Sequence, residues 1–268
     1  MSEGWGAGAA ERWLLLDIGN THTVAGLYRA DGRQEAETRF RTDPAATADE
    51  YRVLLRQLFY DRIGADLWQV ASRAIVSTVV PALEAVVERA CKEAPRRVDF
   101  LSITAKLARS FDLAIPIPES LGADRLANVA GALSLVAPPL LIVDAGTATT
   151  FCLVDDNRRY IGGAIVPGLE TSWRALQARA ARLFSVELVR PESTVGNTTE
   201  TQIRSGVLQG YEAMIEGMAD RLIRDSGLSG ATLIATGGCT RLIRLSERFR
   251  LEPDLTLTGL YQYGRANG

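Results

Sequence analysis

Two apolar runs in this chain end in the same polar phrase. Residues 13–16 lead into Asp17-Ile18-Gly19-Asn20-Thr21, and residues 140–143 lead into Asp144-Ala145-Gly146-Thr147. An apolar run that stops at a glycine is typical of a buried strand followed by a tight turn. The hydrophobic pattern therefore predicts two strands that each present an Asp-x-Gly-x-Thr turn.

The first half of the chain reads as strands and helices that share one core. Alternating positions predict strands over Trp13–Asp17, Thr23–Tyr28 and Glu35–Arg41, and Asp31-Gly32 supplies a turn between the last two. Farther along, apolar residues recur at helical spacing or in short runs. These segments predict a helix over Thr47–Ile63, a strand over Ala74–Thr78, a helix over Pro81–Lys92 and a strand over Val98–Ile103.

The second half repeats this order approximately. It predicts strands over Leu140–Ala145, Phe151–Val154 and Tyr160–Val166, then helices, then a strand over Thr232–Thr236 and a helix from Arg241. The helical region Glu212–Arg224 has an apolar side that could serve a dimer. Strands and helices in this order form a mixed sheet covered by helices, so we expect a duplicated α/β lobe.

Two segments set the expected boundaries of these lobes. The connector Ile115-Pro116-Ile117-Pro118 cannot be helical and marks a lobe boundary or an active-site loop. The start of the chain is rich in Gly and Ala and lacks the basic and apolar regions of a signal peptide. We therefore expect a flexible extension over residues 1–12, an N-terminal lobe over 13–118 and a C-terminal lobe over 119–268.

Composition narrows the classes of protein that fit. The 268 residues are 47% hydrophobic, enough for a substantial core, and the net charge is -2. No basic cluster offers the phosphate contacts of a nucleic-acid binder, and no apolar stretch reaches the ~20 residues that span a bilayer. The three cysteines are scattered and lack metal-ligand spacing, which indicates free thiols in a reducing cytoplasm. We expect a soluble cytoplasmic protein without nucleic-acid or membrane partners.

The repeated phrase has the chemistry of a phosphate and magnesium site. A turn at glycine exposes backbone N–H groups, threonine adds a hydroxyl, and aspartate adds a carboxylate for a hydrated cation. One copy alone is better explained by a structural turn. Two copies, with Gly237-Gly238 after a third strand where bare backbone can approach an adenine or ribose, indicate one nucleotide between two lobes.

A further motif, Gly122-Ala123-Asp124-Arg125, precedes the helix-like run Leu126–Val136. An acid and an arginine at a helix start can be no more than a favourable dipole contact and a surface charge. In a kinase the aspartate accepts the proton of an attacking hydroxyl, and the guanidinium binds a carboxylate or a phosphoryl group.

In chain order, these motifs resemble those of type III pantothenate kinase, a family in the superfamily of acetate and sugar kinases, heat-shock chaperones and actin. The resemblance extends from about Trp13 to Leu260 and includes Gly162–Gly168, the Ser205-Gly206 turn and the closing segment Leu255–Leu260. It implies two related lobes with ribonuclease H-like (actin-like ATPase) mixed sheets flanked by helices. It also implies ATP-dependent phosphorylation of the primary alcohol of pantothenate to 4'-phosphopantothenate, the first step of coenzyme A biosynthesis.

The resemblance also assigns expected roles. Asp124 matches the general base, Arg125 is our choice for the pantothenate carboxylate, and Asp144 matches a ligand of a monovalent cation, K+ or NH4+. Asp17 is expected to serve magnesium as well as ATP, and the family's homodimer, with sites near the interface, is expected here. The other expected substrate contacts are Gly122, Ala123, Thr199 and Ile115. The other expected ATP contacts are Ile18, Gly19, Asn20, Thr21, His22, Thr23, Val24 and Thr147, to which the glycine argument adds Gly237 and Gly238.

One departure from the family leaves two alternatives open. Many members place a substrate-contacting tyrosine nine residues before the catalytic aspartate, where this chain has Ile115. Because that hydroxyl is lost, the first alternative is a kinase of the same fold that acts on another small hydroxy acid or sugar. The other alternative is a nucleotide-binding regulator without turnover, against which stand Asp17, Asp124, Arg125 and Asp144, all of them present.

Overall fold

The computed structural model describes residues 11–179 and 186–267. Most of the flexible extension expected over residues 1–12 lies outside the described residues. Its last two residues belong to the fold, because the first strand begins at Arg12 and the carbonyl of Glu11 accepts a hydrogen bond from the Ala30 amide at 2.8 Å.

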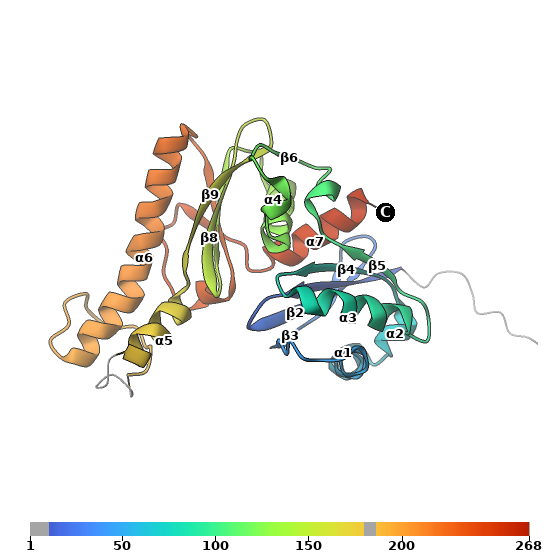
Figure 1. Ribbon diagram of the computed structural model, residues 1–268. Helices are drawn as coiled ribbons and strands as arrows, with labels where there is room; N and C mark the ends of the chain where they lie inside the picture. The colour runs from blue at the N-terminus through green and yellow to red at the C-terminus, as the bar shows by residue number, and fades with distance from the viewer. Residues whose placement is uncertain (1–10, 180–185, 268) are drawn as a thin grey trace, which may run out of the picture.

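The first sheet has the strand order β3-β2-β1-β4-β5. Strand β1 runs antiparallel to β2 and parallel to β4, so the predicted mixed sheet is confirmed. The helices α1, α2 and α3 pack on the outer face (Figure 1). The elements are β1 (Arg12–Ile18), β2 (His22–Arg29), β3 (Gln34–Arg41), α1 (Ala48–Ile63), α2 (Leu67–Val70), β4 (Ala71–Thr78), α3 (Pro81–Lys92) and β5 (Asp99–Ser102).

The second sheet has the order β11-β10-β7-β8-β9-β6. Apart from β6 it repeats the first sheet, with β9, β8, β7, β10 and β11 in the places of β3, β2, β1, β4 and β5, which confirms the predicted duplication. Helices α5 and α6 pack on its outer face. The elements are β6 (Asp112–Leu113), β7 (Leu140–Ala145), β8 (Ala148–Val154), β9 (Arg159–Pro167), α5 (Leu169–Arg179), α6 (Thr199–Ser226), β10 (Thr232–Thr236) and β11 (Phe249–Leu251).

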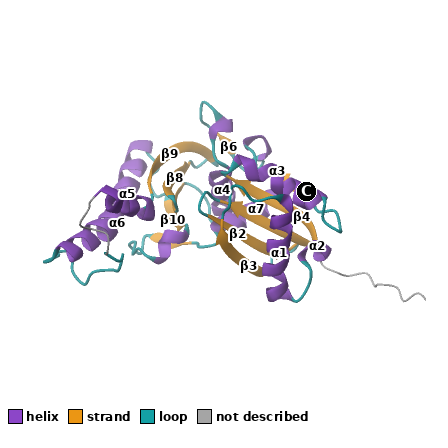
Figure 2. Ribbon diagram, turned by 60° about the horizontal axis from the view of Figure 1, so that its bottom comes forward, coloured by secondary structure: helices purple, strands orange, loops and turns teal. Residues whose placement is uncertain are grey.

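Two helices, α4 (Ala123–Leu135) and α7 (Leu255–Ala266), lie between the sheets and complete the molecule (Figures 1 and 2). They share one apolar core with the inner faces of both sheets. They cross closely at Gly131 and Gly259, since a side chain at Gly259 would overlap the backbone of Ala127. Both sheets therefore pack against the same central pair of helices.

Three short 3-10 turns connect the larger elements: η1 (Ala105–Leu107), η2 (Pro118–Ser120) and η3 (Gly238–Arg241). The helix predicted from Arg241 is wrong, because η3 ends there and an irregular segment leads to β11. The lobe boundary at residue 118 stays a prediction, and two elements cross it. Strand β6 pairs with β9 of the second sheet, and α7 contacts β1 and β4 of the first.

Candidate active site

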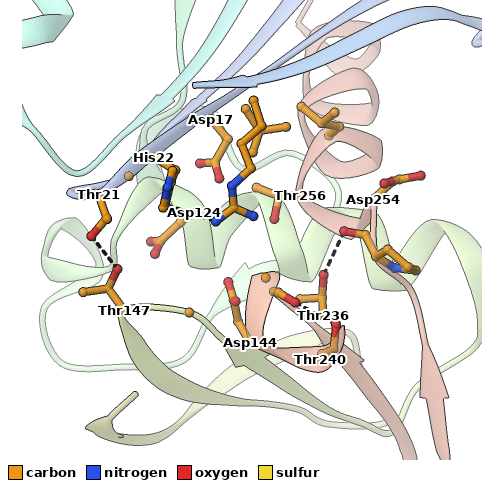
Figure 3. Close-up of a pocket in the computed structure, with 18 of the residues that line it drawn as sticks. Asp17, Thr21, His22, Asp124, Asp144, Thr147, Thr236, Thr240, Asp254 and Thr256 are labelled. Carbon is orange, nitrogen blue, oxygen red and sulfur yellow. Dashed lines mark hydrogen bonds between the residues drawn. The ribbon is translucent and has the colours of Figure 1, made fainter. Parts of the chain in front are cut away.

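The two Asp-x-Gly-x-Thr turns face each other across the gap between the sheets. Each is a tight hairpin, closed by a backbone hydrogen bond from Gly19 to His22 in the first lobe and from Gly146 to Ala148 in the second, both 3.1 Å long. The hydroxyls of Thr21 and Thr147 lie 3.1 Å apart, so the turns meet directly (Figure 3). Exposed turn amides and hydroxyls are groups that bind phosphate.

A cleft of about 440 Å³ opens beside this contact, within the size range of small-molecule sites. The structure brings most of the expected nucleotide residues together in its wall, along with the three expected aspartates; Asp254 and Glu37 also line it. The expected residues that line it are Asp17, Gly19, Asn20, Thr21, His22, Val24, Asp124, Asp144, Thr147, Gly237 and Gly238.

Three carboxylates of different origin converge in the cleft. Asp17 lies near the end of β1, Asp144 near the end of β7, and Asp124 in the first turn of α4. Burial, reinforced by the charges of Asp124 and Asp144, raises the pKa of Asp17 to about 7. Burial and the charge of Asp124 raise the pKa of Asp144 to about 6, although the Asn128 amide opposes the shift.

Asp124 owes its position to a glycine and to a helix start. Its Oδ1 accepts a 2.8 Å hydrogen bond from the backbone N–H of Arg125, in the first turn of α4. A Cβ at the neighbouring Gly122 would lie 2.5 Å from the same oxygen, so a larger residue there would displace the carboxylate. Burial raises the pKa of Asp124, which brings it toward the range that suits a general base.

A buried amide that sequence reasoning missed orients Asp144. Asn128 donates to Asp144 Oδ2 at 2.8 Å and accepts from the Thr256 hydroxyl of α7 at 2.8 Å. Asn128 is 1% exposed within an otherwise apolar stretch of α4, one helical turn after Asp124. A polar residue at that spacing was the available signal, whereas nothing local to Thr256 predicts that α7 lies beside α4.

The turn after β10 forms another wall. Gly237 has φ +94°, and a Cβ there would lie 2.7 Å from the backbone of Ala145 and would also overlap Asp144 Oδ1. Only glycine fits a backbone that is both left-handed and this close to a carboxylate. The ends of β7 and β10 lie side by side, because Thr236 pairs with Asp144 in the sheet.

The carboxylates fit the cations that the resemblance implies. Within residues 11–179 and 186–267, none of the three aspartates forms an ion pair with an arginine or lysine. Buried carboxylates without a cationic partner are suited to metal ions. The same described residues contain no cluster of three or more side chains able to hold a metal alone. That agrees with magnesium, which usually takes one or two carboxylates plus substrate phosphates.

The other expected site residues do not line the cleft. Ile18 and Thr23 are buried in the first lobe, so only their backbone can face a nucleotide. Gly122 and Ala123 flank Asp124 at the helix start, and Ile115 packs against the central core. Arg125 and Thr199 also lie outside the wall.

Arg125 is held against β8 and β9, on the inner face of the second sheet. Its Nη2 donates to the Tyr160 hydroxyl at 2.7 Å and to the Phe151 carbonyl at 3.3 Å, and its Nε contacts Cys152 Sγ at 3.3 Å. Its guanidinium carbon is 5.6 Å from the centre of the Tyr160 ring. The third nitrogen, Nη1, makes no hydrogen bond to the described part of the chain.

Comparison with solved structures shows the fold. A Baf family protein from Campylobacter jejuni has a TM-score of 0.58 at 19% identity, with 95% of this chain and 98% of that chain covered. An activator of 2-hydroxyisocaproyl-CoA dehydratase from Clostridium difficile, with bound ADPNP, has a TM-score of 0.53 at 15% identity, with 96% of each chain covered. Together with the two mixed sheets and their helices, these likenesses confirm the predicted fold class.

Comparison at the level of sequence shows the family. The model of the type III pantothenate kinase family matches residues 13–221. A type III pantothenate kinase from Bacillus cytotoxicus is 35% identical over 256 residues, which cover 95% of this chain and 96% of that protein. The predicted resemblance is therefore confirmed: this chain belongs to the type III pantothenate kinase family.

Proposed function

We propose that the protein transfers the γ-phosphoryl group of ATP to the primary alcohol of pantothenate, with Asp124 as the general base. The observation that carries this proposal is the convergence of three partly buried carboxylates on two phosphate-type hairpins. Family membership supplies the acceptor, because the family and its relative from Bacillus cytotoxicus are named for pantothenate. The product, 4'-phosphopantothenate, enters coenzyme A biosynthesis.

The residues of the cleft divide the reaction between them. Asp124 accepts the proton of the pantothenate hydroxyl while the oxygen of that hydroxyl forms a bond to the γ-phosphorus. The bond from that phosphorus to the β,γ-bridging oxygen breaks, and the electron pair leaves with ADP. The hairpin amides and the hydroxyls of Thr21 and Thr147 hold the phosphates in line, since most of the gain in phosphoryl transfer comes from positioning and electrostatics.

The aspartates at the strand ends are proposed to serve cations. Asp17 would hold magnesium together with the phosphates, and Asp144 would hold a monovalent cation, K+ or NH4+. Such cations, when bound, neutralise the charge that develops on the phosphoryl oxygens. The unpaired state and raised pKa of both carboxylates support this assignment.

The pantothenate side of the site is proposed around Gly122, Ala123 and Arg125. The Nη1 group of Arg125 retains donors for the pantothenate carboxylate, while its other nitrogens anchor it to Tyr160 and Phe151. Ile115 offers apolar contact only, which lowers substrate affinity more than it changes the reaction. Thr199 begins α6, on the outer face of the second sheet, so we propose that it reaches substrate in a second copy of the chain.

This last step makes the homodimer part of the proposal. A cytoplasmic location is included too, and the three free, buried cysteines support it. In the described part of the chain, no helix combines the length and the apolar character needed to cross a membrane.

The reaction is tested by measuring ADP release from ATP with magnesium and potassium, in the presence of pantothenate, acetate or simple sugars. We expect ADP release only with pantothenate, matched by an equal amount of 4'-phosphopantothenate detected by mass. Phosphorylation of another acceptor alone would favour the same-fold kinase of different specificity. ATP binding without any product would favour the regulator.

A further inference from the structure

An arginine that neither the motifs nor the resemblance identifies faces the same cleft. Arg39, on β3, lies directly opposite Val24 of β2, which in turn lies opposite Asp17 of β1. Residues paired across antiparallel strands point to the same face of the sheet. Asp17, Val24 and Arg39 therefore form one row on the cleft face, and all three line the cavity.

The guanidinium of Arg39 spans the gap between the lobes. Its Nη2 lies 3.1 Å from Nδ1 of His22, in the first hairpin. On the opposite side it lies against Gly238 of the second lobe, where a Cβ would come within 2.7 Å of Nη1. The glycine thus leaves room for the guanidinium, and Arg39 stands beside the contact between Thr21 and Thr147.

Arg39 lies close enough to Asp17 and Glu37 for its charge to act on both carboxylates, but it forms no ion pair with either. Two arginines of the same sheet, Arg12 and Arg29, both bind Glu35 at 2.5 Å. Arg41 and Arg73 of this sheet form no ion pair with the described residues, but neither of them lines the cleft. Among the described residues no carboxylate forms an ion pair with Arg39. Its contact with His22 is to a ring kept neutral, because burial and then the charge of Arg39 lower the pKa of that histidine.

We propose that Arg39 binds the phosphate chain of ATP, on the side of the cleft opposite Asp17. Adjacent strands lie ~4.8 Å apart, so the backbones of Asp17 and Arg39 are separated by roughly 10 Å. A phosphate chain laid across Val24 would meet the cation-binding carboxylate at one end of the row and the guanidinium at the other. The planar fork of arginine suits two phosphate oxygens at once.

This inference rests on the proposed function for the identity of the nucleotide, and its test has a readout that needs no turnover. Binding of Mg-ATP is measured by calorimetry for the wild type, Arg39→Ala, Arg39→Lys and Arg41→Ala. Arg41 is the matched control, because it lies two residues farther along the same strand and does not line the cleft. Thermal melts of all four proteins establish that they are folded.

We expect Arg39→Ala to weaken Mg-ATP binding about 10- to 100-fold, the loss of a charge-assisted contact. Arg39→Lys should recover part of the affinity, since it keeps the charge without the fork, and Arg41→Ala should bind like the wild type. In the kinase assay the KM for ATP should rise while the KM for pantothenate stays unchanged.

Unchanged ATP affinity in folded Arg39→Ala would overturn the proposal. So would an equal loss in Arg41→Ala, which would indicate a diffuse effect of charge. Should Arg39→Ala fail to fold, Arg39→Lys decides alone, and wild-type affinity with the fork removed would count against a bidentate contact. If the wild type binds ATP without phosphorylating pantothenate, the proposed function fails while the contact of Arg39 with phosphate is still measured.

Discussion

The aspartates of the cleft are placed where their charges cost stability. Asp17 and Asp144 are enclosed, close to one another and to Asp124, and burial is the largest cause of their raised pKa values. A partly buried carboxylate that forms no ion pair within the described residues destabilises the protein when it is charged. The proposed cation site therefore lowers the free energy of unfolding of the protein without ligands.

This arrangement predicts how stability depends on pH. The folded-state pKa values, about 7 for Asp17 and about 6 for Asp144, lie above the ordinary 3.8 of the unfolded chain. Between these limits the folded protein holds protons that the unfolded chain has released, so the contribution of both groups falls as pH rises. We expect Asp144→Asn to raise the free energy of unfolding at about pH 8 and to flatten its slope down to about pH 5.

Urea unfolding of the wild type and Asp144→Asn across that range, without nucleotide or metal ions, measures the effect. The difference between the two proteins isolates Asp144 from the other titrating groups. A loss of stability in Asp144→Asn at the alkaline end would show that the hydrogen bond from Asn128, and not the buried charge, dominates at this position.

Individual residues also show where sequence reasoning succeeded and stopped. Asp17 and Asp144 were predicted from the strand that precedes each one, and the structure brings them together with Asp124. Asn128 was missed although its spacing from Asp124 in an apolar stretch was an available signal, whereas the position of Arg39 depends on neighbours that the sequence does not reveal. Arg39 faces the cleft only through its register with Val24 and Asp17.

At the scale of elements, strands were predicted better than the helices that pack between them. The strands carry the apolar runs, and their succession along the chain agrees with the prediction except for the short strands β6 and β11, which were not predicted. Helix α7 was not predicted, because its sequence has alternating Leu and Thr followed by glycines and tyrosines, which favour no helix locally. Burial between two sheets and against α4 stabilises it instead.

The crossing of α4 and α7 gives a prediction for glycines. A Cβ at Gly259 would overlap the carbonyl of Ala127, so Gly259→Ala must separate the helices and should cost about 1–3 kcal/mol of unfolding free energy. Gly217 of α6 is the control, since a Cβ there meets nothing within 4 Å. Gly217→Ala should stabilise the protein by about 0.5–1 kcal/mol, the ordinary gain in a helix.

Urea unfolding of the two variants and the wild type provides the comparison. Equal effects of both substitutions would mean that helix propensity alone governs Gly259. In that case the close crossing would not be a constraint on the central layer.

The whole molecule is two copies of one sheet around a shared helical layer, with the reacting groups at the seam. Asp17 comes from the first sheet, Asp144 from the second, and Asp124 from the helix between them. At the cleft the two lobes meet directly, with Thr21 against Thr147 and Arg39 against Gly238. In the proposed reaction, both lobes contact one nucleotide, and Asp124 of the central layer is the proposed base.

The central claim is that Asp124 removes the proton of the pantothenate hydroxyl in this cleft. The most direct measurement is the rate of 4'-phosphopantothenate formation by Asp124→Asn, together with its ATP binding by calorimetry. The control variant is Asp156→Asn, because Asp156 lies in an exposed turn. The account predicts a turnover rate lowered about 10²- to 10⁴-fold, with ATP binding retained and the control fully active. Near-normal turnover in folded Asp124→Asn would contradict it and remove Asp124 from the role of base.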